Sequence, residues 1–423
     1  MSEQMPSAAK TPTSANRFVA VDIFRGLTIT AMIIANDPGD WGHVYAPLLH
    51  ADWHGITPTD LIFPFFLFIV GVAVALSLSK RITSGSSNLE LIRKAAVRTL
   101  AIFGLGIFLS LFPEFDFSNI RVPGVLQRIA IVYFACVLLF AFTNPKVQAF
   151  VAASLLIGYC ALLGVVPVPI DDTIEGALET GSIERAHSTV ELNTVERLSE
   201  DSIQANLQPG INLQAWMDRK FVPGRLYEKT WDPEGLLSTL PAIASGILGM
   251  LAGVLLTRTR SNRSQNNAAQ PNHLDTRREQ SFLLLLSGFG LLIAGFVWDW
   301  TFPFNKNLWS SSFVLLTGGL ASMTLGSLIW LIDCRGYDRW FYVAQVFGAN
   351  AITAFVLHGV VWRLLVWSWD EDGTNIKSTF MDGLTTSWEL DRTLVSFLWA
   401  LAYTAIIFVP VCIMYHRRWF VRL

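Results

Sequence analysis

The segment NDPGDWGHVYAPLLHADWHGITPTDLIFPFFLFIVG, residues 36–71, runs from a polar loop directly into one of the most apolar stretches of the chain. Its polar part is rich in histidine, aspartate and tryptophan, which stand at His43, His50, His54, Asp37, Asp40, Asp52, Asp60, Trp41 and Trp53. Ionisable groups are costly at membrane depth, so they gather there only with a partner, water or a function. The segment therefore predicts chemistry at a membrane boundary.

The composition of the whole chain places it in the membrane. Of 423 residues, 52% are hydrophobic and only 15% are charged, whereas soluble domains carry about 25% charged residues. The 31 basic and 33 acidic residues nearly balance. No global positive field or basic-aromatic stripe is present, which argues against a nucleic-acid partner.

Apolar runs long enough to cross a bilayer follow one another along the chain. A spanning helix needs about 20 mostly apolar residues, and about ten segments meet this requirement. They cover residues 18–35, 59–79, 95–111, 125–142, 147–166, 235–256, 282–300, 309–332, 340–367 and 394–414. The predicted fold is an all-α polytopic membrane protein of about ten transmembrane helices.

The polar segments between the spans suggest the domain organisation and the orientation. Residues 1–16 predict a disordered tail, residues 17–423 one transmembrane domain, 167–232 a long loop with little structure, and 257–280 a disordered basic linker. The positive-inside rule assigns the ends of the spans that are rich in lysine and arginine to the cytosol. Both termini are then cytosolic, and the loops at 36–59, 167–232, 302–308 and 368–391 are extracytoplasmic.

The sequence carries few signs of metal, disulfide or nucleotide chemistry. The four cysteines form no CxxC pair and lie mostly in apolar runs, so core thiols are expected, with no disulfide framework and no metal site. No phosphate-cradling glycine loop and no nucleophile elbow occurs.

Polar residues inside or beside the spans are the candidates for function. They are Asp22, Arg25, Asn36, Asp60, Gln127, Arg128, Asp299, Asn350 and His358. Asp22 and Arg25 are three residues apart and can pair along a helix, either as a structural salt bridge or as ligands. Asn350 and His358 are eight residues apart and are expected on nearly one face of a helix.

Three histidines of the first polar loop qualify equally as proton-transfer groups. Imidazole is the side chain best matched to proton transfer near neutral pH. The alternative interpretation is that each of these histidines is an ordinary loop residue exposed to water. For His50, Asp52 is a possible orienting carboxylate and the neighbouring tryptophans a possible apolar wall. Composition alone does not choose between His43, His50 and His54.

Two further segments have both a structural and a functional interpretation. Residues 303–319 combine amides, a lysine and hydroxyls, which suits an interfacial belt anchored by Trp309 or a rim that binds a polar, sugar-like substrate. WDPEG at 231–235 suits a helix start, with Pro233 in the first turn and Asp232 and Glu234 beside it.

Several separated motifs resemble one family. VDIFRG, HADWHGITPTDLIFPFFLFIVG, PGVLQRIAIVYF, DPEGLLSTL, NKNLWS and GANAITAFVLH, in this order, are similar to the catalytic membrane domain of the heparan-α-glucosaminide N-acetyltransferase family and its bacterial relatives. The resemblance covers essentially all spans. The large lumenal N-terminal domain of the animal enzymes has no counterpart here, so the resemblance is to a bacterial relative in a cell membrane.

The resemblance implies a reaction. Acetyl would pass from cytosolic acetyl-CoA across the membrane to the amine of a glucosamine-type amino sugar. The family motif H-x-S-W-N-G reads HADWHG here, which selects His50 as general base or acetyl carrier, with Asp52 and His54 as departures. Asn36 matches the asparagine that closes the first span and is expected to stabilise the oxyanion. Asp60 is the third expected catalytic residue.

The remaining site residues are expected to bind the two substrates or partners. Arg25 and Arg128, with Asp22, would hold acetyl-CoA. The acceptor would contact Asp232, Glu234, Asn305, Lys306, Asn307, Trp309, Asn350 and His358. The lipid bilayer and a homodimer are the other expected partners.

Two other classes of function stay open from the sequence. In a transporter or flippase for a polar solute, Asp60, Arg128, Asn350 and His358 would form a relay in the membrane. A non-catalytic membrane scaffold is the third class.

Overall fold

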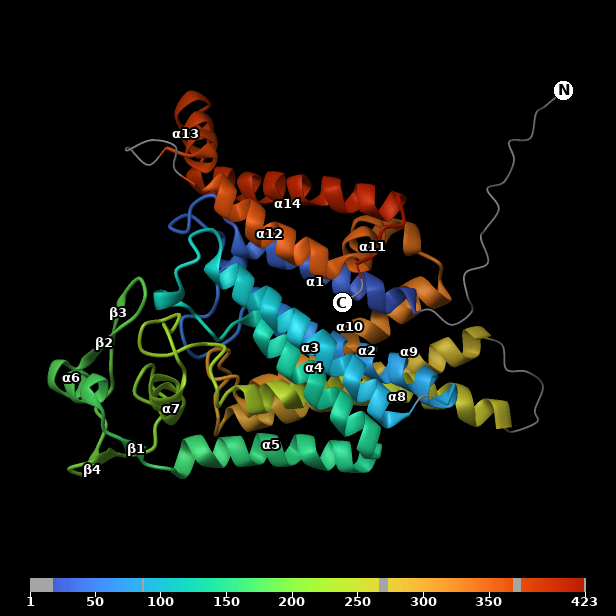
Figure 1. Cartoon of the computed structure of the whole chain (residues 1–423), viewed down its shortest axis with the longest axis horizontal. Coiled ribbons are helices and arrows are strands. Elements are labelled where there is room, and N and C mark those ends of the chain that lie inside the picture. Colours follow the sequence, from blue (N-terminus) through green and yellow to red (C-terminus); the bar gives the residue numbers. More distant parts are fainter. Residues whose placement is uncertain (1–17, 86, 266–272, 368–373, 422–423) are drawn as a thin grey trace.

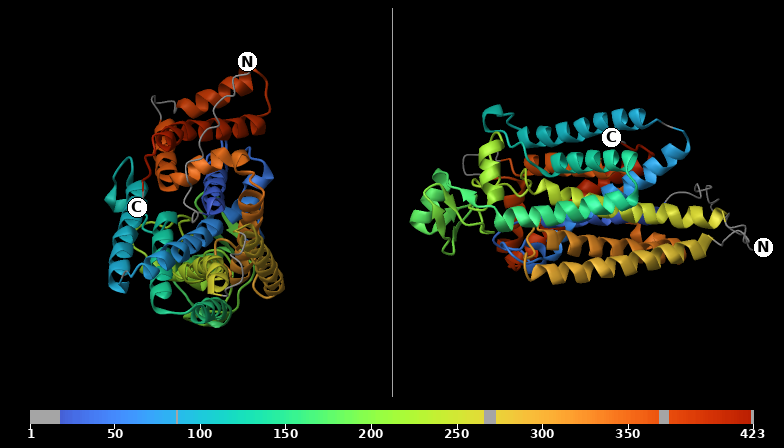
Figure 2. Two further views of the ribbon diagram at one scale, coloured as in Figure 1. Left: turned by 90° about the vertical axis from the view of Figure 1, so that its right-hand side faces the viewer. Right: turned by 90° about the horizontal axis from the view of Figure 1, so that it is seen from below.

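The computed structural model describes residues 18–85, 87–265, 273 to 367 and 374–421 of the chain. The tail predicted at residues 1–16 lies outside this part. Figure 1 shows long helices lying side by side with their axes roughly parallel, and Figure 2 shows the same bundle from its end and from below.

Apolar helices account for most of the described chain, and they occupy the predicted spans. Nine of them are long and apolar enough to cross a membrane, and a bent pair makes up to ten. The single helices are α1 (Val19–Asn36), α2 (Ile62–Thr83), α3 (Asn88–Leu111), α4 (Val125–Phe142), α5 (Pro145–Val165), α8 (Thr239–Gln265), α9 (His273–Asp299), α10 (Ser311–Leu328) and α14 (Arg392–His416). The predicted all-α polytopic membrane fold is confirmed.

The predicted span at 340–367 is broken into two helices. α11 (Tyr342–Ala349) and α12 (Ala351–Leu365) meet at 74°. Asn350 stands at the break with non-helical φ −128° and ψ 43°. The prediction that Asn350 and His358 share one continuous helical face is therefore wrong, because the helix begins anew after Asn350.

Glycines set the closest approaches between helices. A Cβ atom added at Gly71 of α2 would lie 1.9 Å from the carbonyl oxygen of Gly246 in α8, and one at Gly249 would lie 1.9 Å from that of Phe68. At these positions only glycine leaves room for the neighbouring backbone. Such small residues let transmembrane helices approach closely and pack by van der Waals contact, since no hydrophobic driving force acts between helices in lipid. α2 and α8 are thereby fixed against each other at the centre of the bundle.

The two ends of the bundle differ. One end, called the loop end, carries residues 37–61, 112–124, 166–238 and 300–310, and the opposite, or tail, end carries the connections at 143–144 and 335–341 (Figure 1). At the loop end, residues 166–238 form α6 (Asp172–Thr180), α7 (Leu213–Phe221) and two small antiparallel sheets. The strands are β1 (Val168–Pro169), β2 (Ser182–Glu184), β3 (Thr189–Glu191), β4 (Arg197–Ser199) and β5 (Ser202–Ile203), in the orders β1-β5-β4 and β2-β3.

The segment 166–238 has its own small core. Ile174, Ile183 and Ile203 pack in one cluster with Tyr159 and Leu163 from the end of α5. This packing holds the segment against the loop end of the bundle, beside the residues of the candidate site.

Three expectations about local structure are corrected. The basic linker predicted to be disordered at 257–280 is helical in its described residues, since α8 continues to Gln265 and α9 begins at His273. The loop predicted at 368–391 contains α13 (Ile376–Ser387), capped by Asn375. WDPEG does not start a helix, because α8 begins only at Thr239 and Asp232 has other partners, described below.

Candidate functional site

A histidine and a buried carboxylate form the centre of the candidate site. Thr57 and Asp60 make a reciprocal capping box on the turn Pro58–Leu61 that precedes α2. One oxygen of Asp60 accepts from the backbone N–H of Thr57 at 2.9 Å and of Ala51 at 3.2 Å. The other oxygen lies 2.7 Å from Nδ1 of His50.

This arrangement fixes the state of the imidazole. The Asp60 carboxylate is fully buried, whereas 43% of the His50 side chain is exposed. A carboxylate next to Nδ1 holds the proton there and leaves the lone pair on Nε2. The orienting carboxylate is thus Asp60, and the alternative considered for Asp52 is not realised.

A lysine from a distant loop completes the centre. Nζ of Lys306 lies 3.0 Å from both ring nitrogens of His50 and 3.8 Å from Oδ1 of Asp60. The two equal distances place the ammonium over the edge of the ring that carries both nitrogens, so it lies beside Nε2 without being aligned on its lone pair. Burial lowers the pKa of Lys306, and the charges of Asp60 and Glu234 oppose this effect.

The other two loop histidines have different surroundings. His43 is half-exposed and pairs with Asp40 at 3.1 Å, close to Arg392. His54 contacts the amide of Asn305 at 3.4 Å, and burial lowers its pKa so that the neutral ring is favoured. Only His50 of the three combines a buried carboxylate, a neighbouring cation and an exposed edge.

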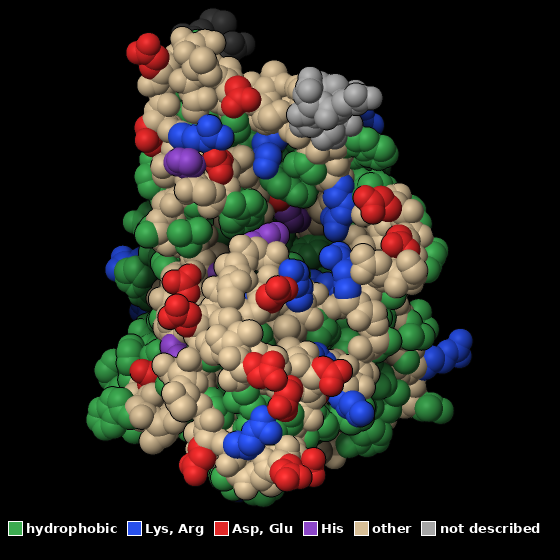
Figure 3. Space-filling view, turned by 90° about the vertical axis from the view of Figure 1, so that its left-hand side faces the viewer, with side chains coloured by type: hydrophobic (Ala, Val, Ile, Leu, Met, Phe, Trp, Pro, Cys, Tyr) green, Lys and Arg blue, Asp and Glu red, His purple; other side chains and the backbone are tan. Residues whose placement is uncertain are grey.

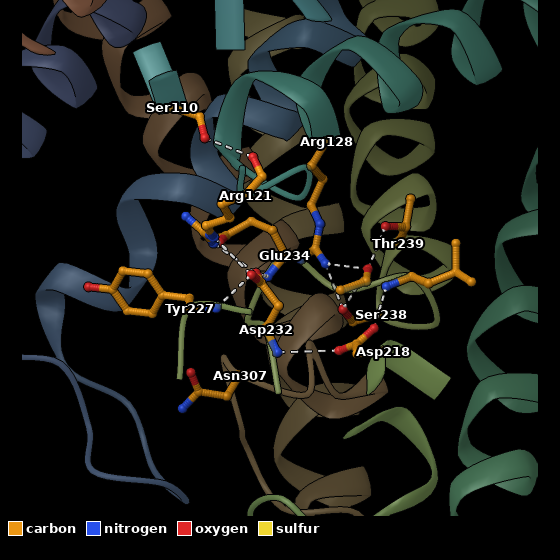
Figure 4. A network of polar contacts seen from close by, with 12 residues as sticks. Ser110, Arg121, Arg128, Asp218, Tyr227, Asp232, Glu234, Ser238, Thr239 and Asn307 are labelled. Carbon is orange, nitrogen blue, oxygen red and sulfur yellow. Dashed lines mark hydrogen bonds and ion pairs between the residues drawn. The ribbon is translucent and has the colours of Figure 1, made fainter. Parts of the chain in front are cut away.

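A charge network lies next to this centre (Figure 4). Arg121 donates to both oxygens of Asp232, at 2.8 and 2.7 Å, and to Glu234 at 2.6 Å. Asp232 is fully buried and also accepts from the backbone of Tyr227 at 3.0 Å. Burial lowers the pKa of Arg121, but the two carboxylates outweigh this effect and raise it.

The third carboxylate in Figure 4 accepts from backbone N–H groups. Asp218 of α7 is fully buried and accepts from the N–H groups of Leu236 at 2.8 Å and Asp232 at 3.3 Å. No cation pairs with it directly among the described residues. Burial raises its pKa to about 7.

Asp218 therefore predicts a dependence of stability on pH. Its pKa in the folded state lies above the ordinary aspartate value of 3.8, so the folded protein binds this proton more tightly, and the stability that this proton contributes is lost as the pH rises. Between pH 5 and pH 8 the loss is about 2–3 kcal/mol. We expect Asp218→Asn to flatten this part of the pH profile in thermal unfolding followed at several pH values. Parallel profiles of the two proteins would contradict the assignment.

Arg128 and Trp309 form a buried pair behind the network. Arg128 donates to Ser238 at 2.6 Å, and its guanidinium lies 5.2 Å from the Trp309 ring centroid. Trp309 is 1% exposed and donates to Ser245 at 3.1 Å. Both side chains are enclosed within the protein, so Trp309 is neither an interfacial anchor nor part of a surface rim.

The predicted donor residues are not brought together. Arg128 stands in the first turn of α4 at the loop end, whereas Arg25 lies in the first half of α1 and donates to Asp22 and to the carbonyl oxygen of Gly348, both at 3.3 Å. The predicted pairing of Asp22 with Arg25 is confirmed. Asn36 ends α1 with an exposed side chain, and no contact between it and His50 occurs in the described part of the chain.

The amides of the NKNLWS motif shape the turn that presents Lys306. Asn305 is fully buried, and its Oδ1 accepts from the N–H of Leu308 at 2.8 Å. The backbone oxygen of Asn307 accepts from Gln214 at 3.1 Å. These contacts place the lysine over His50.

A cleft opens at the loop end. Its volume is about 840 Å³, and it is lined by α3, residues 121–127, 186–187 and 219–229, and α12. Figure 3 shows this end of the molecule hollowed, with histidine and basic side chains around the opening. His358 of α12 lines the cleft, and its Nδ1 lies 2.8 Å from the buried carboxylate of Asp37.

Sequence reasoning missed several of these residues. Asp37 was noted only as one of four loop aspartates, and Arg121, Arg225 and Arg363 carried no motif that set them apart. A signal was nevertheless present for Arg121, which stands two residues before the PGVLQR motif. No group of three or more histidine, cysteine or acidic side chains suited to a metal occurs among the described residues.

Comparison with known proteins shows which family this chain resembles. The family model described as "Heparan-alpha-glucosaminide N-acetyltransferase, catalytic" matches residues 17–169. A heparan-alpha-glucosaminide N-acetyltransferase of Mus musculus is 28% identical over 399 residues, covering 84% of this chain and 55% of the relative. The Homo sapiens protein of the same name is 26% identical over 394 residues, covering 84% and 54%. The chain thus spans about half the length of these relatives, and the resemblance predicted from the motifs is confirmed.

Proposed function

We propose, on the premise that this chain is similar to the heparan-alpha-glucosaminide N-acetyltransferases, that it is a membrane acetyltransferase acting on the amine of a glucosamine-type amino sugar, with acetyl-CoA as donor. The observation that carries the proposal is the His50–Asp60 pair at the loop end, 2.7 Å apart. A buried carboxylate that orients a half-exposed imidazole is the arrangement a general base needs.

The reaction can be written with these groups. The acceptor amine attacks the thioester carbonyl of acetyl-CoA, a C–N bond forms, and His50 Nε2 takes the proton that the nitrogen loses. The C–S bond then breaks, and the proton passes to the leaving thiolate, which gives CoA. Asp60 keeps Nδ1 protonated throughout and stabilises the imidazolium that forms.

Lys306 adds a cation at the point where negative charge develops. Its ammonium lies 3.0 Å from both ring nitrogens of His50, so it is next to an amine that approaches Nε2. From there the ammonium can donate to the oxyanion of the tetrahedral intermediate. Asn36 remains our second proposed donor to that oxyanion.

The orientation in the membrane is part of the proposal. The basic residues at the tail end include Lys80, Arg81, Arg93 and Lys94, and the positive-inside rule puts that end in the cytosol. The loop end with His50 is then extracytoplasmic. Arg25 and Asp22 lie in the half of the bundle nearer the tail end, which suits contact with the donor, whereas the enclosed Arg128 suits a structural role.

The transporter alternative has less support from the geometry. Its four relay residues have separate partners: Asp60 pairs with His50, Arg128 with Ser238 and His358 with Asp37, and Asn350 accepts from the backbone N–H of Val421. A proton or ion relay needs neighbouring members that contact one another. We therefore favour the enzyme.

The test is acetyl transfer by the purified protein in proteoliposomes. We expect labelled acetyl-CoA and glucosamine to give N-acetylglucosamine and free CoA, both followed by mass spectrometry, because the His50 pair can activate the amine. Boiled protein and liposomes without protein are the controls. Uptake of the sugar without CoA release would favour the transporter and refute the proposal.

A further inference from the structure

We propose that the cleft between α3 and α12 binds an anionic group, a phosphate or a carboxylate, carried by a saccharide acceptor. This inference rests on the proposed function and deepens it by naming the substrate class. It concerns residues outside the His50 centre.

The cleft is lined by one sign of charge. Five basic side chains and two histidines line it, and no aspartate or glutamate does so in the described part of the chain. The basic residues and histidines are Arg121, Arg219, Arg225, Lys229, Arg363, His187 and His358. A cleft lined by one sign of charge with walls of low dielectric concentrates ligands of the opposite sign.

Three of these cations already pair with carboxylates of the protein. Arg219 pairs with Asp171 at 2.8 Å, and Lys229 pairs with Glu184 at 3.3 Å. Arg121 is held by the two carboxylates described above. Their charge is therefore partly satisfied before any ligand arrives.

Arg225 and Arg363 are different. Within the residues that the structure describes, Arg363 donates to the carbonyl oxygen of Gly359 in its own helix, at 2.7 Å, and forms no ion pair. The Arg225 side chain makes no ion pair within the described part of the chain, and its positive charge acts unfavourably on Arg363. Neither arginine has an ion pair with a carboxylate in the described part of the chain, although the charge of Asp37 acts favourably on Arg363. An oxyanion in the cleft that both arginines line would relieve their repulsion and accept hydrogen bonds from their N–H groups.

The inner wall of the cleft suits the rest of a sugar. His358 is 12% exposed, and its Nδ1 faces Asp37, which leaves Nε2 for a ligand. A neutral imidazole in this tautomer accepts a hydrogen bond, which a sugar hydroxyl can donate. Burial raises the pKa of Asp37, and the charges of His358, Lys377 and Arg363 oppose that rise.

The cleft and the His50 centre are neighbours. Arg121 lines the cleft and donates to Glu234 at 2.6 Å. Glu234 in turn is close enough to Lys306 for its charge to act on the lysine, whose Nζ lies 3.0 Å from His50. The charge network thus connects the cleft with the centre, and in this proposal the acceptor has its anion at the arginines and its amine at the imidazole.

The experiment compares three sugars that differ in one group each. Glucosamine, glucosamine 6-phosphate and glucose 6-phosphate are titrated by calorimetry, without acetyl-CoA, into the full-length protein in a neutral maltoside detergent. We expect glucosamine 6-phosphate to bind at least about tenfold more tightly than glucosamine, as charge-assisted hydrogen bonds to a pair of arginines give. Glucose 6-phosphate should compete with it. Equal binding of glucosamine and its phosphate overturns the proposal.

Variants locate the effect. Arg225→Gln combined with Arg363→Gln should remove the preference for the phosphate and leave binding of glucosamine within about twofold, as expected when only the charge-assisted bonds are lost. Arg197→Gln is the matched control, because this exposed arginine pairs with Glu175 and does not line the cleft. Arg225→Gln alone, at an exposed position, should fold even if the double variant does not, and it should weaken the preference for the phosphate. A preference that survives in both the single Arg225 variant and the double variant overturns the proposal.

Two further measurements distinguish a saccharide from a lipid headgroup as the ligand, and failure of this proposal from failure of the proposed function. If the two arginines bind a lipid headgroup, nanodiscs with 30% phosphatidylglycerol will abolish the preference that is seen in pure phosphatidylcholine, and the saccharide assignment is then wrong. The His50→Ala protein should keep the preference, because binding does not need the base. A retained preference together with absent acetyl transfer in the wild type would refute the proposed function and leave the cleft assignment standing.

Discussion

Replacing His50 by alanine is expected to lower the rate of acetyl transfer about 10²–10⁴-fold, the usual contribution of a positioned general base. The imidazole is held by Asp60 at 2.7 Å and is half-exposed at the loop end, whereas His43 and His54 have other partners. Stability should change little, because an exposed loop side chain contributes little packing. The rate of CoA release with glucosamine as acceptor, measured on detergent-purified protein, gives the result.

The matched control is His43→Ala. His43 belongs to the same loop and also pairs with an aspartate, Asp40, but both side chains are partly exposed and the contact is longer, at 3.1 Å. We expect it to keep at least about half of the wild-type rate, as surface substitutions usually do. A similar loss in both variants, or none in His50→Ala, would show that His50 is not the base.

Asp60→Asn separates positioning from proton transfer. An amide at this place can keep the contact with Nδ1 but does not stabilise the imidazolium, and it can reverse the tautomer. The activity should fall while the protein keeps its fold, since the turn Pro58–Leu61 still has its cap at Thr57. The pH profile should change as well, which a purely structural role would not produce.

The spans were predictable from the sequence because hydrophobicity over about 20 residues is a strong signal in a membrane protein. The break at Asn350 was not, because its cause is the packing of α11 against α1 and of α12 against α3, which no local pattern reports. Close approach at Gly348, where an added Cβ would lie 1.9 Å from the carbonyl oxygen of Asp22, illustrates that packing.

The site was predictable only in part, for a similar reason. The histidine of the HADWHG motif was selected by resemblance, and composition left His43, His50 and His54 equal. The sequence offered Asp52 as a possible orienting carboxylate, whereas the structure gives this role to Asp60, which the capping box with Thr57 holds in place. The cation at His50 comes from Lys306, 256 residues away, and the cleft gathers residues from α3 to α12. Such long-range meetings depend on the tertiary fold.

The charge network beside the site leads to the second large effect. Arg121 is 18% exposed and bridges Asp232, which is fully buried, and Glu234, which is 11% exposed. Taking an ion pair out of water is costly, and removing one partner leaves the other charge buried without compensation. Asp218 lies next to Asp232, so a third acidic group would share the pocket.

Arg121→Leu is therefore expected to destabilise the folded protein by about 3–5 kcal/mol. Thermal unfolding in detergent, read by intrinsic tryptophan fluorescence, measures the loss. Arg197→Leu is the control, because its pair with Glu175 is half-exposed on both sides and such pairs contribute about 0–1 kcal/mol. Adding Asp232→Asn to Arg121→Leu should recover part of the loss, since a neutral amide no longer needs the guanidinium. If the single and double variants unfold together, the uncompensated charge is not the cause, and the loss comes from the stacking of Arg121 on Tyr227, 4.7 Å from its ring centroid.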